Sequence, residues 1–132
     1  MTHQELIWII TGALIALAFI SKATCDTLDF HFENSIFNTP NRIHFFGPSS
    51  WSNCYKNNNV LSGPKFLGST TCFIWLTSGW HLFDFIRSIS LIAAIFINVY
   101  GTFTEALLYG FVMFMVGSLI FELFYSKLLK KK

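Results

Sequence analysis

Three long apolar segments leave this chain few ways to fold in water. They are LIWIITGALIALAFI (6–20), LFDFIRSISLIAAIFINVY (82–100) and FTEALLYGFVMFMVGSLIFELFY (103–125). A helix that crosses a bilayer needs about 20 mostly apolar residues. The chain is also only 12% charged, against roughly 25% in an average soluble domain. We therefore predict an all-α membrane protein with three transmembrane helices, at about 4–21, 82–100 and 103–125.

The positions of the basic residues predict how these helices are oriented. Lysines and arginines occur between the first two spans and after the third, at Lys22, Arg42, Lys56, Lys65, Lys127, Lys130, Lys131 and Lys132. The segment before span 1 and the turn at 100–102 contain none. By the positive-inside rule, the N-terminus lies outside and the C-terminus inside, which places residues 22–81 in the cytoplasm. A cleaved signal peptide is not expected, because the opening MTHQE carries an acid and no basic residue.

The 132 residues suffice for one membrane domain, in which the segment 22–81 is expected to be ordered. This segment is too rich in aromatic residues for a disordered tether, and its Asn, Ser, Pro and Gly residues favour turns. We predict that 22–37 is a helix continuing span 1 into the cytoplasm. An irregular aromatic cap would follow at 38–69, and a long helix at 70–100 would begin at the membrane surface.

Two stripes of polar residues stand at the cytoplasmic edge of the predicted spans. Residues at i, i+4, i+7 and i+11 share one face of a helix. The stripes are Lys22, Asp26, Asp29 and Glu33 on the first helix, and Thr77, His81, Asp84 and Ser88 on the second. Arg87 can pair with Asp84 at i,i+3. Because ionisable groups are costly in a membrane and turn inward to pair, we predict that the two stripes face each other.

One interpretation of the stripes is a metal or acid–base site. Its predicted metal ligands are Asp26, Asp29, His81 and Asp84, with His31 as a secondary candidate. Three carboxylates and an imidazole suit a divalent metal such as Zn. Glu33 and Asp84 would be the catalytic groups, and the anion-binding residues would be Lys22, Lys56 and Arg87. Such a protein would be a metal-assisted hydrolase or transferase, acting on a lipid or phosphorylated substrate at the cytoplasmic face.

The other interpretation is structural. Lys22 and Arg87 would neutralise the carboxylates, and the network would only fasten two helices together. The chain would then be an accessory or assembly component of a membrane complex, in contact with other membrane subunits or with further copies of itself. The chain has no HExxH, HxxxH or CxxC motif, which favours this interpretation without excluding the enzyme.

Other partners and cofactors are not expected. A haem needs an axial ligand inside a span, and no histidine lies deep in one. No nucleotide cofactor is predicted, and a net charge of +2 is too small to suggest a nucleic-acid partner. The three cysteines, Cys25, Cys54 and Cys72, form no CxxC pair. We expect them to be reduced thiols.

Four segments carry a resemblance to known sequences: DTLDFHFENSIF, SSWSNCYKNNN, GPKFLGSTT and WHLF. Together they resemble a set of small integral membrane proteins from Bacteroidota genomes, in which the corresponding segments read SWKNKYK, KFxGSTT and TDxWHLF. The similarity covers about residues 20–85. It implies a bacterial inner (cytoplasmic) membrane location with several spans, and no particular activity. The chain departs from the pattern at Ser52, Cys54 and Ser78, where the resemblance implies Lys, Lys and Asp, so a metal site here would have one carboxylate fewer.

Overall fold

The computed structural model describes residues 2–98, 112, 115–117, 119–121 and 123–129. Its elements are α1 (His3–Phe30), η1 (Phe32–Asn34), α2 (Ile43–Phe46), η2 (Ser50–Cys54), η3 (Lys56–Asn58), η4 (Val60–Ser62), η5 (Ile74–Leu76), α3 (Gly79–Ile97) and η6 (Phe124–Leu128). Helices and turns make up this part of the chain, with one isolated β-bridge between Tyr55 and Pro64. The prediction of an all-α fold is confirmed for the described residues.

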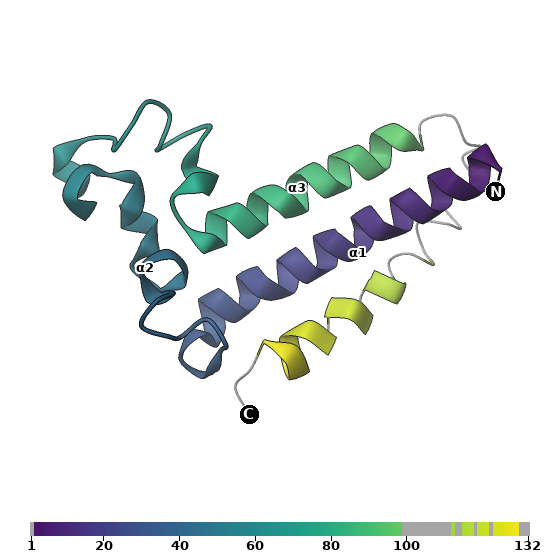
Figure 1. Cartoon of the computed structure of the whole chain (residues 1–132), viewed down its shortest axis with the longest axis horizontal. Helices are drawn as coiled ribbons and strands as arrows, with labels where there is room; N and C mark the ends of the chain where they lie inside the picture. The colour runs from purple at the N-terminus through teal and green to yellow at the C-terminus, as the bar shows by residue number, and fades with distance from the viewer. Residues whose placement is uncertain (1, 99–111, 113–114, 118, 122, 130–132) are drawn as a thin grey trace.

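Helix α1 and helix α3 lie side by side and run in opposite directions (Figure 1). The small residues Ser90 and Ala94 of α3 are buried. Near the far end of the pair, the Asn98 amide donates to the Thr11 hydroxyl at 2.7 Å. Small side chains let helix backbones approach, and a polar bond between helices adds to their packing. The pair is therefore held together along much of its length.

The described residues between 112 and 129 run along another side of α1 (Figure 1). Gly117 is buried there, and a Cβ added to it would overlap the ring of Phe19. The core of the molecule lies where this segment meets the end of α1, and it contains the buried residues Ala23, Leu28, Phe32, Phe37 and Leu129. This core joins the C-terminal segment to the helix pair.

Helix α1 begins and ends at sites with local hydrogen bonds. At its start, the Thr2 hydroxyl accepts from the Glu5 N–H at 3.2 Å and the Glu5 carboxylate accepts from the Thr2 N–H at 2.8 Å, a capping box. At its end, the prediction of a helix through residue 37 is wrong, because α1 stops at Phe30. The Ser35 hydroxyl bonds the backbone of Phe32 and Phe37. Such local bonds compete with helix formation.

Helix α3 begins later than expected. The prediction of a helix that starts at residue 70 is wrong. Residues 70–78 form turns and the short helix η5, and α3 starts at Gly79. Ser78 is its N-cap, and the Ser78 hydroxyl accepts from the His81 N–H at 3.4 Å. Serine is a favoured N-cap residue because it satisfies an otherwise unpaired N–H of the first turn. The start of α3 is thus set by Ser78, slightly before the expected span at 82–100.

Two helices of the described part are long and apolar enough to cross a membrane, α1 with 28 residues and α3 with 19. The predicted first span, 4–21, lies within α1, and α3 covers most of the second. The third predicted span, 103–125, lies mostly outside the described residues. The described part therefore contains two candidate spans rather than three.

The segment between α1 and α3 forms a cap at one end of the helix pair (Figure 1). We use the name cap for residues 38–78. The cap is built from α2 and short helical turns, and aromatic contacts fix it to the rest of the molecule. The Phe46 ring lies 4.8 Å from that of Phe37 and 6.5 Å from that of Phe83 in α3, measured between centroids. Phe46 thus connects the cap with α3 and with the segment that follows α1.

Candidate functional site at the cap end of the helix pair

The basic residues of both polar stripes pair with acids on their own helix. Lys22 forms an ion pair with Asp26 in α1, and Arg87 pairs with Asp84 in α3, as the i,i+3 spacing predicted. The Lys22 ammonium also lies 5.8 Å from the centroid of the Phe121 ring. Half-exposed pairs of this kind contribute about 0–1 kcal/mol each. They neutralise charge locally, and neither pair joins α1 to α3.

Two other contacts join the helices near the stripes. The indole N–H of Trp80 donates to the Asp29 carboxylate at 2.9 Å. The buried Cys25 thiol donates to the Trp80 carbonyl at 3.6 Å. The ends of the two helices therefore meet beside the stripes. On the α3 side both contacts are made by Trp80, which belongs to neither stripe.

His81 is oriented by the residue that caps its helix. The Ser78 hydroxyl lies 2.7 Å from the imidazole Nδ1. Both residues line a cavity of about 280 Å³, together with Asp29 and Trp80 of the helix ends and several cap residues. Of the predicted ligands, Asp29 and His81 thus share one cavity.

The predicted ligand set is not gathered around a single point. Within the described ranges, no three His, Cys, Asp or Glu side chains lie close enough together to hold a metal ion. Asp26 and Asp84 are each held by a basic neighbour. Asp29 is bonded to Trp80.

The remaining predicted residues lie apart from this cavity. His31 caps the end of α1, and its ring packs against Tyr125 with 5.3 Å between centroids. Glu33 is exposed in η1, and Lys56 is exposed in η3 of the cap. Neither lines the cavity that contains Asp29 and His81. Acid–base chemistry by Glu33 and anion binding by Lys56 stay predictions without a shared site.

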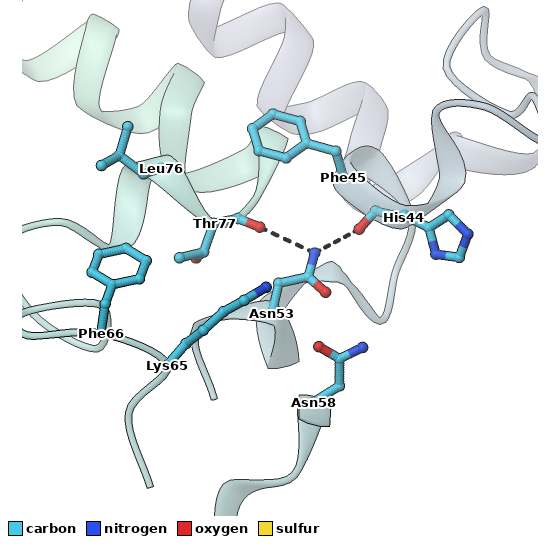
Figure 2. A pocket seen from close by; sticks show the side chains of 8 residues that line it. All are labelled: His44, Phe45, Asn53, Asn58, Lys65, Phe66, Leu76 and Thr77. Carbon is cyan, nitrogen blue, oxygen red and sulfur yellow. Dashed lines mark hydrogen bonds between the residues drawn. The ribbon is translucent and has the colours of Figure 1, made fainter. Parts of the chain in front are cut away.

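A second cavity lies within the cap and has a volume of about 390 Å³. Its eight lining residues are His44, Phe45, Asn53, Asn58, Lys65, Phe66, Leu76 and Thr77 (Figure 2). This cavity has no signal in the sequence, because its residues follow no helical or strand spacing. The role of Ser78 at the start of α3 could have been predicted, since a serine before a helical pattern is a recognised signal for the start of a helix.

Comparisons with known proteins add no functional information. No protein-family model, curated protein or solved structure matches the chain. The resemblance to Bacteroidota membrane proteins is neither supported nor opposed by this result. The function has to be inferred from the residues of the chain and the contacts that they make.

Proposed function

We propose that the chain is a multi-pass protein of the cell inner membrane, with its N-terminus outside and its cap in the cytoplasm. Its role would be that of an accessory or assembly component of a membrane complex. The two candidate spans support the membrane location. The distribution of lysine and arginine supports the orientation.

The pairing of the stripe carboxylates is the observation that carries this proposal. Asp26 pairs with Lys22, Asp84 with Arg87, and Asp29 with the Trp80 indole. An active site needs titratable groups that converge on a cavity and are free to bind a substrate or a metal. These three carboxylates are engaged by a protein partner, two within their own helix and one between α1 and α3, which suits a structural role.

The turn at residues 59–62, which we call the tip of the cap, offers a surface for a partner subunit. Val60 is 51% exposed and the adjacent Leu61 is 94% exposed. Asn59 fixes this turn, because its side-chain oxygen accepts from the Leu61 N–H at 3.0 Å. Contiguous exposed apolar patches mark interaction sites, and these adjacent side chains form a small one. We expect this tip to contact another membrane subunit or a second copy of the chain.

Site-specific photo-crosslinking in native membranes tests the accessory role. A photoreactive amino acid at Leu61 should give a discrete adduct with one partner subunit or a second copy, identified by mass spectrometry. The matched control is the same label at Asn41, which is also exposed in the cap and lies away from the tip in sequence. If Leu61 gives no more adduct than Asn41, and the purified chain is monomeric by native mass spectrometry, the accessory proposal is wrong.

A second candidate function is the hydrolase or transferase, which the cavity shared by Asp29 and His81 favours. A carboxylate and an imidazole in one cavity can act as an acid–base pair. This function predicts turnover of a lipid or phosphorylated substrate by the purified chain, lost in both Asp29→Asn and His81→Gln. Turnover that survives in either variant would come from another site or from a contaminating enzyme.

A further inference from the structure

The larger cavity, in the cap, presents donors without acidic neighbours. None of its eight lining residues is Asp or Glu. Lys65 contributes an ammonium group and Asn58 an amide, while the His44 imidazole points away from both (Figure 2). Among the described residues, these three side chains form neither hydrogen bonds nor ion pairs. A cavity with one lysine, further donors and no carboxylate has the charge and the hydrogen-bonding groups to bind an anion.

The frame of this cavity is set by hydrogen bonds. The Asn53 amide donates to the His44 carbonyl at 2.6 Å and to the Thr77 carbonyl at 3.1 Å, which joins α2 to the residues before α3 (Figure 2). The Ser69 hydroxyl donates to the Cys54 carbonyl at 2.7 Å and accepts from the Lys65 N–H at 3.1 Å. The backbone on both sides of the cavity is therefore held before any ligand binds, which lowers the cost of binding.

One wall of the cavity continues into an apolar surface beside α3. Phe66 and Leu76 line the cavity, and the neighbouring Leu67 is 94% exposed. Trp75 stacks on Phe85 in the second turn of α3, with 4.8 Å between ring centroids and 10° between planes. This stack holds η5 (Ile74–Leu76) alongside the start of a candidate span, and aromatic and apolar side chains are typical of the bilayer surface.

We propose that the cap cavity binds the phosphate group of an anionic phospholipid. Lys65 and Asn58 would donate to the phosphate, while Phe66 and Leu76 would contact the glycerol and the first carbons of the acyl chains. A volume of about 390 Å³ suits a headgroup, since sites for small molecules occupy about 300–1,000 Å³. This inference rests on the membrane location proposed above and is independent of the accessory role.

Lipid binding to the full chain in mild detergent tests this inference. Phosphatidylglycerol is titrated against phosphatidylcholine, and native mass spectrometry counts the lipids that stay bound. We expect one phosphatidylglycerol per chain and an affinity about tenfold lower in Lys65→Gln, because a charge-assisted hydrogen bond is lost. Lys127→Gln is the matched control, since Lys127 is an exposed lysine of η6 that does not line the cavity. It should bind as the parent does.

Three results would overturn the proposal. Equal losses in Lys65→Gln and Lys127→Gln would indicate general attraction to basic residues. Competition by inorganic phosphate at concentrations comparable to the lipid would identify the ligand as a free phosphate, and equal binding of phosphatidylcholine would remove the role of charge. Extraction of the chain from membranes by alkaline carbonate is measured separately, so that a wrong membrane location is distinguished from a wrong lipid site.

Discussion

The indole of Trp80 donates a hydrogen bond to the Asp29 carboxylate, 2.9 Å away and 51 positions earlier in the chain. The bond joins the first turn of α3 to the last turn of α1. It occupies Asp29, which, like Glu33, has no basic partner among the described contacts. The contact that joins α1 to α3 here is therefore a hydrogen bond from Trp80, and not the expected network of Lys22 and Arg87 with the carboxylates.

Replacing Trp80 by Phe should destabilise the arrangement of α1 and α3. The variant keeps most of the ring packing and loses the hydrogen bond to Asp29, so we expect a loss of about 1 kcal/mol in the free energy of unfolding. Because the pair is exposed to solvent, a larger loss is not expected. Unfolding in mixed micelles measures the change. In a double-mutant cycle with Asp29→Asn, additive effects would show that the bond contributes nothing.

Gly79 should not tolerate a side chain. A Cβ at this position would overlap the Phe46 ring, so Gly79→Ala should force the cap away from α3 at a cost of about 1–3 kcal/mol. Limited proteolysis of the cap and thermal unfolding measure the effect. The double variant Gly79→Ala, Phe46→Leu should recover part of the loss, because the smaller side chain leaves room. If the single variant is as stable as the parent, this close approach is not present in solution.

Metal content separates the two proposed functions. Because no three metal-binding side chains are grouped in the described residues, we expect far less than one metal ion per chain after purification without chelator. Elemental analysis of the parent and of a His81→Ala, Asp84→Ala double variant measures this. Circular dichroism of both proteins provides the control for folding. One ion per parent chain, lost in a folded double variant, would support the hydrolase and contradict the purely structural interpretation of the stripes.

Cysteine labelling reports on which side of the membrane the cap lies. The three thiols are free, as predicted; Cys72 is exposed, while Cys25 and Cys54 are buried. Buried thiols react slowly, so a membrane-impermeant maleimide should modify Cys72 alone. Labelling is expected in inside-out vesicles and not in sealed right-side-out vesicles, with Cys72→Ser as the unlabelled control. The opposite result would reverse the proposed orientation.

Local features of this chain could be read from its sequence. The long apolar segments predicted α1 and α3, because hydrophobic pattern is the main signal of helical structure in a sequence. The Asp84–Arg87 pair followed from helical spacing, which brings neighbouring turns together in any helix. The helix boundaries could be predicted less well. The end of α1 depends on the Ser35 hydroxyl, which bonds the neighbouring backbone and so competes with continuation of the helix.

Contacts between distant residues were decided by the tertiary structure. The Trp80–Asp29 bond and the cavity that contains Lys65 join residues with no shared periodicity. Their positions depend on how Phe46 packs between the cap and α3, and on where Asn53 ties α2 to Thr77. The sequence by itself determined which segments are helical and apolar, because these properties follow from local composition and spacing. Only packing decided which polar groups meet, because loops such as this cap have no repeat that predicts their path.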